Sequence, residues 1–174
     1  MIIKDKRSNI VKFIALTLLV LSWATYSFAQ CSRNTNHTII EPISIEWFSN
    51  MNFSNVVVSS KVAGTVLLAP AGTCKARGGV RLLHAVNGTV TAACVRVNGQ
   101  ENYTYSIILP ITVTLTSGAN TIMANAFTSN PATSGQIAIG GSQQLSIGAT
   151  LNIEAANPVG LYVGTAFAVT VNPN

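Results

Sequence analysis

Tyr103-Thr-Tyr-Ser-Ile-Ile-Leu-Pro110, followed by Ile111-Thr-Val-Thr-Leu-Thr116, is the stretch that decides the fold of this chain. Apolar or aromatic residues take every second position before Pro110, and the alternation resumes after it, as in β-strands with one buried face. Tyrosine, isoleucine, valine and threonine also favour strands. A strand with such an apolar face must be covered by a second sheet. The stretch therefore predicts two strands, joined at a proline, inside a layered β-structure.

An amino-terminal segment shows the same alternation. Ile43, Ile45 and Trp47 are separated by polar residues, so one face is apolar and the other polar. This pattern is typical of an antiparallel strand that is buried on one side. Pro42 lacks a backbone N–H, which places the strand at a sheet edge or at a bulge.

A further strand is predicted over residues 90–97. Ala93, Val95 and Val97 share one of its faces, while Cys94 shares the other with an arginine. The arginine indicates that this second face is solvated. We therefore expect the valine face to be the buried one.

Glycine, asparagine and proline mark the reversals between the strands. Asn87-Gly88 is typical of a two-residue hairpin, and Asn98-Gly99 turns the chain into the stretch quoted above. A polar loop is predicted over residues 128–136, around Asn130-Pro131, and the last strand over residues 162–171. Strands of this length, with turns roughly every eight to twelve residues, are typical of a β-sandwich.

The first 29 residues have the pattern of a cleaved secretory signal peptide. Basic residues at positions 4–12 precede an apolar run from Phe13 to Ala24, which is too short for a mature transmembrane helix. Ser27-Phe28-Ala29 has the small-x-small form of a cleavage site. We expect a mature chain that begins at Gln30 and has no membrane span. Export would take it to the cell surface, the medium or the periplasm.

Removal of this peptide changes the charge argument. The whole chain carries a formal charge of +5, but four basic residues and the only aspartate, Asp5, lie in the first 29 residues. Six basic residues and four glutamates remain, which leaves +2. Lys75, Arg77 and Arg81 are close in sequence and are expected to be solvated strand residues. This modest charge does not point to a nucleic-acid partner.

Three cysteines lie in the exported part, where disulfides are permitted. Cys74 and Cys94 are the natural pair, because they would close a loop worth roughly 3 kcal/mol in chain entropy. Cys31 is left over, as a free thiol or as a partner in an intermolecular bridge. A lipid anchor on Cys31 is the alternative, but it would require a small residue just before the cysteine, and Gln30 is not small.

The residues that support catalysis or metal binding are scarce. His37 and His84 are far apart and neither has a carboxylate or a second ligand at a motif spacing. Cys94 has no positioned histidine that would make it a nucleophile. We therefore predict no enzyme, no cofactor and no metal site.

Several segments together resemble one exported bacterial family, domain of unknown function 4402. The segments that carry the resemblance are Pro42-Ile-Ser-Ile45, Met51-Asn-Phe53, Gly78-Gly-Val80, Tyr103-Thr-Tyr-Ser-Ile107 with Leu109-Pro110, Phe127-Thr-Ser-Asn-Pro131, Ile147-Gly-Ala-Thr-Leu151, and Gly160-Leu-Tyr-Val-Gly-Thr165 with Val169-Thr-Val-Asn172. They cover nearly the whole mature chain. The family is also distantly similar to spore-coat-U-like pilin subunits of chaperone–usher fimbriae.

The resemblance implies a secreted or surface β-sandwich from a Gram-negative bacterium, with no established activity. The expected fold is a single immunoglobulin-like or pilin-like sandwich over residues 30–174, although the sequence leaves immunoglobulin-like and jelly-roll connectivity open. The chain departs from the family pattern in two places. Ser54 stands where the family usually has a glycine, which bears on a tight turn there. Pro173 stands where the family often has a tyrosine.

Two functions follow as hypotheses. The first is a structural surface protein, such as a pilin-like fimbrial subunit that assembles with itself or with other surface subunits by strand addition. Residues 30–37 are polar throughout, however, whereas a donor strand needs alternating apolar residues. The second is a self-contained adhesin or glycan-binding module, with a host-surface or glycan ligand contacted by residues 99–102 and 128–136.

Overall fold

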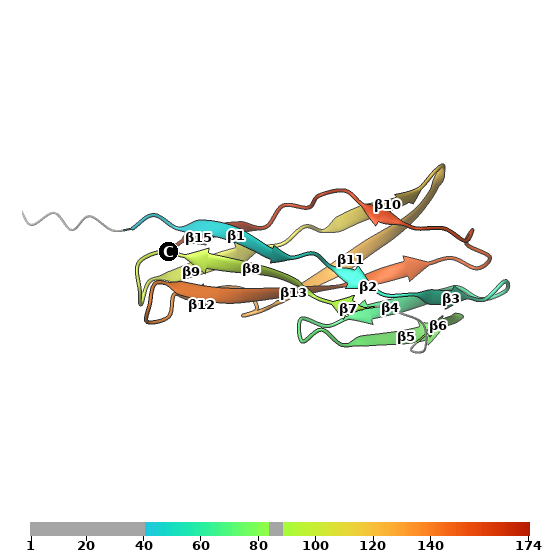
Figure 1. Ribbon diagram of the computed structural model, residues 1–174, viewed down its shortest axis with the longest axis horizontal. Helices are drawn as coiled ribbons and strands as arrows, with labels where there is room; N and C mark the ends of the chain where they lie inside the picture. The colour runs from blue at the N-terminus through green and yellow to red at the C-terminus, as the bar shows by residue number, and fades with distance from the viewer. Residues whose placement is uncertain (1–40, 84–88) are drawn as a thin grey trace, which may run out of the picture. The chain divides into compact units, whose positions relative to one another are not determined.

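The computed structural model describes residues 41–83 and 89–174, and these ranges contain strands and connections but no helix. The strands are β1 (Ser44–Ser49), β2 (Asn52–Phe53), β3 (Val56–Val58), β4 (Gly64–Leu68), β5 (Cys74–Gly78), β6 (Val80–Leu82), β7 (Val90–Thr91), β8 (Ala93–Asn98), β9 (Thr104–Ile108), β10 (Thr112–Ser117), β11 (Asn120–Asn130), β12 (Ser134–Gln136), β13 (Ser142–Ile153), β14 (Val163–Gly164) and β15 (Thr170–Pro173). All of their pairings are antiparallel. The protein is an all-β sandwich, as predicted (Figure 1).

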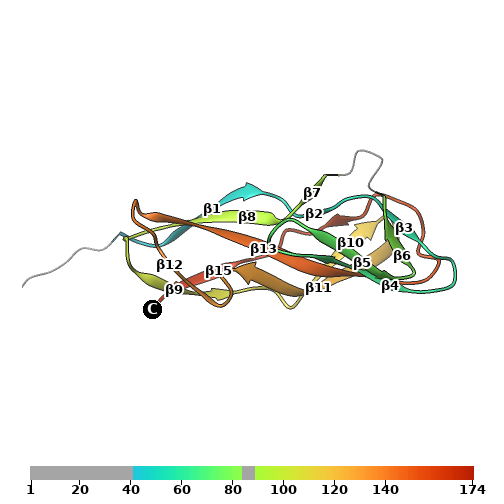
Figure 2. The same cartoon turned by 90° about the horizontal axis from the view of Figure 1, so that it is seen from below.

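The strand β13 organises the larger sheet. This sheet runs in the order β1-β8-β13-β11-β10-β14, and β4 also pairs with β13 and carries β5 on its outer side. One edge of β13 is shared by two strands, because residues 142–147 pair with β8 and residues 149–153 pair with β4. The other edge of β13 pairs with β11. A single long strand thus holds together two ends of the sheet (Figures 1 and 2).

Gly148 lies where the two partners of β13 meet. It is buried, and a Cβ atom at this position would run into the carbonyl oxygen of Leu68 at the end of β4. The backbone of β4 therefore approaches β13 more closely than a side chain would allow. This close approach lets β4 continue along the edge of β13 where β8 ends.

The second sheet has the order β12-β9-β15. Two small ladders, β2 with β7 and β3 with β6, complete the described pairings. The chain passes from the second sheet to the larger one at residues 109–111, since β9 belongs to the former and β10 to the latter. Pro110 interrupts the pairing at this passage. The prediction of two strands joined at a proline and covered by a second sheet is confirmed.

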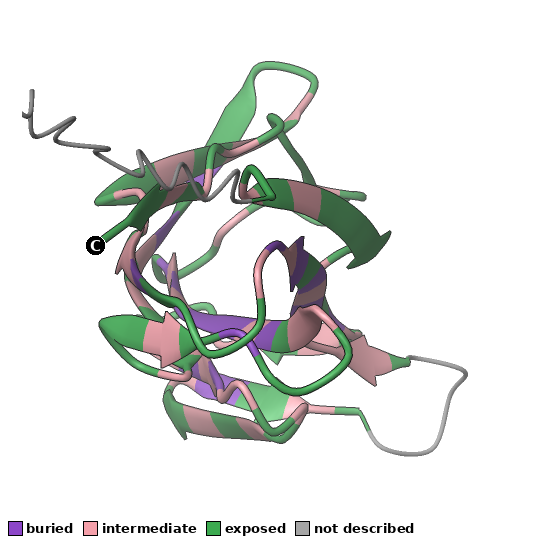
Figure 3. Ribbon diagram, turned by 90° about the vertical axis from the view of Figure 1, so that its left-hand side faces the viewer, coloured by how far each residue is buried: buried purple, intermediate pink, exposed green. Residues whose placement is uncertain are grey.

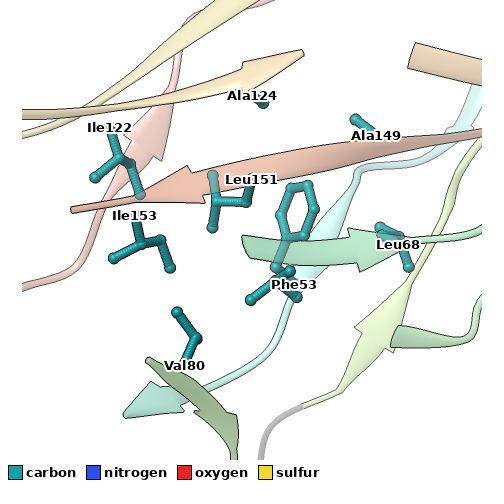
Figure 4. Close-up of a cluster of buried hydrophobic side chains, with 9 residues drawn as sticks. Phe53, Leu68, Val80, Ile122, Ala124, Ala149, Leu151 and Ile153 are labelled. Carbon is teal, nitrogen blue, oxygen red and sulfur yellow. The ribbon is translucent and has the colours of Figure 1, made fainter. Parts of the chain in front are cut away.

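Two clusters of buried side chains form the core. The first lies between β13, β4 and β11 on one side and β2 and β6 on the other, and it contains Phe53, Leu68, Val80, Ile122 and Leu151 among its members (Figure 4). The second lies between the two sheets and consists of Ala93, Val95, Val97, Tyr105, Ile137, Leu145 and Ile147. The partly buried Met51 and Phe127 pack against both clusters. In Figure 3 the buried residues lie on the strands that line the interior.

The alternation in β8 agrees with its prediction. Ala93, Val95 and Val97 are fully buried, whereas Arg96 is exposed. The prediction of an edge strand after Pro42 is also confirmed, because β1 ends the sheet and its pairing with β8 is irregular between Trp47 and Ser49.

Two predicted segments differ from the structure. Most of the expected loop over residues 128–136 is strand, because β11 continues to Asn130 and β12 begins at Ser134. The expected last strand over residues 162–171 is broken into β14 and β15, and residues 165–169 between them are in no strand. An alternating pattern shows only which side of an extended chain is buried. Residues 165–169 keep this alternation although they are not paired with a neighbouring strand, so the pattern alone could not show the break.

The turn at Ser54 forms without the glycine of the family pattern. Ser54 has a φ of 67°, in the left-handed region that glycine adopts most easily. Its N–H is held at 2.8 Å from the Oδ1 atom of Asn52. The asparagine side chain thus supports a backbone conformation that the serine itself does not favour.

Several predictions fall outside the described residues. They are the signal peptide over residues 1–29, the mature start at Gln30, the fate of Cys31, the roles of His37 and His84, and the hairpin at Asn87-Gly88. These stay predictions. Of the described residues, no helix is long and apolar enough to cross a membrane.

Candidate functional site

The candidate site is the seam between the two sheets where β1 and β15 lie. We define the open seam as β1, the preceding Ile43, and residues 165–173. Within the described residues, β1 pairs with β8 on one side and β15 pairs with β9 on one side. Neither strand is hydrogen-bonded to the other. The two sheets therefore each end in an unpaired edge at the open seam, near the carboxyl end of the chain (Figures 1 and 2).

Apolar side chains from both edges point into the seam. Ile43 and Ile45 come from the β1 side, and Phe167, Val169 and Val171 come from the other side. All five are partly buried and pack against the second core cluster. Their alternation with exposed residues follows from the period of two, which sends every second side chain inward. The seam is thus lined by the margin of the hydrophobic core.

An aromatic contact links the two edges. The rings of Trp47 and Phe167 are 5.3 Å apart between centroids and meet edge to face. Phe167 also lies 5.5 Å from Phe127, which belongs to β11. Edge-to-face pairs of this kind contribute roughly 0.5–1.5 kcal/mol beyond the area that they bury. Trp47 nevertheless keeps 46% of its surface exposed, so the seam is only partly closed at this point.

The backbone of β15 offers hydrogen-bonding groups to the open seam. The N–H of Asn174 donates to the carbonyl of Thr104 at 3.1 Å, so Asn174 faces β9. Successive residues of a strand direct their N–H and C=O groups to opposite sides. Asn172 therefore also faces β9, whereas Val171 and Pro173 face away from it. Pro173 has no N–H, which shortens the free edge at its carboxyl end.

The same parity applies to β1. The N–H of Gly99 donates to the carbonyl of Gly141 at 3.0 Å, in the register that pairs β8 with β13. Odd-numbered residues of β8 therefore bond to β13 and even-numbered ones face β1. Even-numbered residues of β1 lie opposite these, so Ile45 and Trp47 direct their N–H and C=O groups away from β8. On each edge, the same residue thus directs its apolar side chain toward the core and its backbone N–H and C=O groups away from its own sheet.

Charge is sparse around the seam. Arg96 lies 3.9 Å from Glu46, measured from Nη1 to Oε2, and both side chains are about half exposed. The guanidinium carbon of Arg96 also lies 4.2 Å from the centre of the Phe48 ring. The exposed outer face of β1 is therefore covered by one arginine, while its inner face stays apolar.

A cleft lies on the far side of residues 165–169. It has a volume of about 590 Å³ and separates these residues from the passage between β9 and β10. Leu109, Pro110 and Val113 line one wall, and Phe167 and Ala168 line the other. The two chain segments are joined at both ends of the cleft, because β15 pairs with β9 and β14 pairs with β10. Residues 165–169 are therefore held at their ends and unpaired in the middle.

The predicted disulfide between Cys74 and Cys94 is not formed in the structure, where both are free thiols. Cys94 lies opposite Ser146 of β13, whereas Cys74 lies opposite Leu68, which itself faces Ala149. Three residues along a strand span about 10 Å, and Cys74 is a further strand away. A disulfide needs Cα atoms within about 7 Å. The spacing in sequence did not reveal that β8, which carries Cys94, pairs with β13, whereas β5, which carries Cys74, pairs with β4 instead.

Two groups have altered acidities, the partly buried Cys74 and the buried Tyr105. Burial raises the pKa of the Cys74 thiol, whose Sγ lies 4.0 Å from the carbonyl oxygen of Phe53. Burial also raises the pKa of Tyr105, whose hydroxyl donates a hydrogen bond of 2.7 Å to Oε1 of Gln143. Both shifts favour the neutral form, so neither group is prepared to act as a nucleophile or base at neutral pH.

The described residues bring together no group of three or more histidine, cysteine, aspartate or glutamate side chains that could hold a metal ion. His37 and His84 lie outside these residues. The distinctive arrangement in the structure is the pair of unpaired edges at the open seam. From the sequence, the residues of the open seam were predicted only as ordinary strand positions. Pro42 and Pro173, which flank the two edges, were the available signal for them.

Comparison with known proteins yields one match. No curated protein and no solved structure matches the chain. One family model, described as Domain of unknown function (DUF4402), matches residues 43–172, which begin at the first apolar residue of the seam and end within β15. The match covers the two edge strands and everything between them. The chain therefore belongs to the DUF4402 family.

Proposed function

We propose that this protein is a non-enzymatic structural protein, exported to the surface of a Gram-negative bacterium, that joins other subunits in a pilin-like manner by accepting a β-strand at the open seam. The observation that carries the proposal is the pair of unpaired edges, β1 and β15, with partly buried apolar side chains between them. An extended peptide inserted between the two edges would bond to the outward groups of both Ile45 and Val171 and place alternating side chains against the second core cluster. The signal peptide predicted over residues 1–29 supports export.

The glycan-binding hypothesis has less support from the same surface. Sugar binding on an aromatic platform needs an accessible ring face, but Arg96 covers the ring of Phe48. Trp47, its neighbour, is engaged with Phe167. The loop between β11 and β12 is limited to residues 131–133, which leaves little room for contacts of the kind first assigned to residues 128–136.

The test replaces one backbone N–H at the seam. Val171→Pro removes an N–H that faces away from β9, so the sandwich keeps its pairing while the free edge loses a donor. Asn172→Pro is the matched control, because it removes an N–H that faces β9. We expect Val171→Pro to fold with a melting temperature close to that of the wild type, and Asn172→Pro to lose about 1–3 kcal/mol of stability, because the ladder bond to β9 is lost.

The measurement is gel electrophoresis of protein sheared from the cell surface, without boiling and with detection of this chain. Strand addition predicts a ladder that resists detergent and collapses on boiling, and Val171→Pro should reduce it to monomer. A ladder that collapses on reduction alone would instead assign the assembly to Cys31. A wild-type monomer band under all conditions would contradict strand addition.

A further inference from the structure

The charges of the sandwich are separated along the direction of β13. Three glutamates gather where β13 begins. Glu46 lies on β1 at the level of Gln144, Glu41 precedes β1, and Glu101 follows β8 and accepts a hydrogen bond of 3.4 Å from the N–H of Gly140. We call Glu41, Glu46 and Glu101 the acidic end. Within the described part of the chain, only Arg96 adds a positive charge here, and it is the ion-pair partner of Glu46.

The remaining cations gather where β13 ends. Lys75 and Arg77 lie on β5 at the levels of Thr150 and Asn152 of β13. Lys61 precedes β4, and Arg81 follows Val80, which packs against Gly64 at the start of that strand. We call Lys61, Lys75, Arg77 and Arg81 the basic end. All four are exposed and have no ion pair within residues 41–83 and 89–174, and Glu154 is the only acidic residue beside them.

The two ends are far enough apart to act separately. Six residue steps of β13 separate the level of Gln144, where Glu46 lies, from the level of Thr150, where Lys75 lies, which corresponds to about 20 Å. The Debye length is about 8 Å at physiological ionic strength. The attraction between the two ends of one molecule is therefore screened, and each end remains available to an oppositely charged surface.

Exposed apolar side chains accompany both ends. At the basic end the connection from β13 to β14 carries Val159 and Leu161, which are 105% and 82% exposed. This connection is tied to the basic end by the hydrogen bond of 2.9 Å from the N–H of Ala156 to the carbonyl of Ser59. Tyr162 holds it in place, since its hydroxyl accepts a hydrogen bond from Nδ2 of Asn157 and donates one to the carbonyl of Pro158, both at 2.9 Å. Trp47 and Phe48 follow Glu46 on β1 and remain 46% and 55% exposed, although Arg96 lies over one face of the Phe48 ring and Phe167 contacts Trp47.

We propose that a second copy of this chain docks its basic end on the acidic end of the first, so that copies associate head to tail. The two ends carry opposite net charges, so a second copy of the chain complements each of them. Each end also has apolar residues that can form the centre of a contact with a charged rim. Such a contact uses different surfaces on the two partners, so it can repeat as an open chain. The inference rests on the proposed function, in that it names the partner of the assembly and its direction.

The experiment measures the self-association of the exported protein by sedimentation velocity at low ionic strength and at about 1 M salt, where the Debye length falls to about 3 Å. Two variants are compared with the wild type. Arg77→Glu with Arg81→Glu makes both ends acidic, and Glu41→Lys with Glu101→Lys makes both ends basic. All four residues are exposed, so thermal unfolding should show that both variants keep the fold.

We expect the wild type to associate at low salt and to dissociate at high salt, and each variant alone to associate at least about tenfold more weakly. An equal mixture of the two variants should recover association as pairs, since the acidic end of one then meets the basic end of the other. The proposal is overturned if self-association is unchanged by salt and by both variants, or if the equal mixture of the two variants does not associate.

Two further outcomes separate this inference from the function on which it rests. If the wild type is monomeric at low salt but binds heparin through Arg77 and Arg81, the basic end serves a polyanion and the head-to-tail contact is wrong. Strand addition would still stand if the detergent-resistant ladder forms. If salt-sensitive association occurs but Val171→Pro leaves the surface assembly unchanged, the head-to-tail contact stands and strand addition fails.

Discussion

Ser54 shows how one residue can carry a strained backbone in an otherwise regular fold. Its φ of 67° lies in the region that a side chain with a Cβ atom avoids, at a cost of roughly 1–2 kcal/mol. Asn52 offsets part of this cost through its hydrogen bond to the Ser54 N–H.

Ser54→Gly should therefore raise the free energy of unfolding by about 0.5–1 kcal/mol, because glycine accepts this φ without strain but gains freedom in the unfolded chain. Urea denaturation of the wild type and the variant measures the change. Ser54→Ala is the control and should not be stabilised, because it keeps the Cβ atom. Equal stabilisation by alanine would show that the backbone conformation is not the cause.

Tyr105 is the second residue with a clear energetic role. Its ring is fully buried between the sheets, and a Cβ atom at Gly135 would collide with its hydroxyl end. Burial raises its pKa in the folded protein, so the unfolded tyrosine ionises first as the pH rises above about 10. The stability that Tyr105 contributes is present below that pH and is lost as the pH rises through the folded pKa.

Tyr105→Phe should cost about 1 kcal/mol at neutral pH, since the hydrogen bond to Gln143 is lost. Above about pH 10 the stability of the wild type should fall more steeply than that of the variant, so the two curves converge. Chemical denaturation between pH 7 and 11 checks this, and the other alkaline groups are common to both proteins. Parallel curves over this range would contradict the assigned pKa direction.

At the scale of the strands, pairing along β13 decides what the cysteines can do. Cys94 is on β8, which pairs with the first half of β13, whereas Cys74 is on β5, which is separated from the second half of β13 by β4, so the two cannot reach each other without backbone movement. The sequence suggested a bridge because both cysteines lie in the part that is predicted to be exported and would close a loop of favourable length. Two strands of similar pattern need not be neighbours.

Both thiols should consequently react with iodoacetamide after denaturation without a reductant, which mass spectrometry of the two peptides detects. In the folded protein Cys74 should react slowly, because burial raises its pKa and less thiolate is present. A disulfide-linked pair of peptides containing Cys74 and Cys94 would contradict the strand pairing that separates them.

At the scale of the whole molecule, β13 joins two core clusters into one structure. It supplies Leu145 and Ile147 to the second cluster and Ala149, Leu151 and Ile153 to the first. Neither cluster can lose this strand without affecting the other. Met51 and Phe127, which contact both clusters, add to the coupling.

The protein should therefore unfold in a single transition, as small domains usually do. After removal of residues 1–29, Trp47 is the only tryptophan and reports on the open seam, while circular dichroism reports on all strands. The two probes should give the same urea midpoint. An earlier midpoint for the tryptophan would show that the seam edge opens independently of the rest of the sandwich.

The sequence by itself determined that this protein is built from strands and which faces of those strands are buried. The alternation in β8 and on either side of Pro110 was sufficient, because the period of two depends only on the local backbone. It also identified the family, through short motifs that lie in order along residues 43–172. The edge position of β1 was readable from Pro42, since a missing N–H is a local property.

The tertiary structure alone decided how the strands are arranged. Four features depend on which strands become neighbours. They are the passage of residues 109–111 between the sheets, the sharing of β13 by β8 and β4, the separation of the cysteines, and the open seam. Neighbours are chosen by contacts between residues distant in sequence, and alternation is the same whichever strand lies alongside. The charge separation was hidden for the same reason, because Glu101 and Arg77 were assigned to opposite ends only by the register along β13.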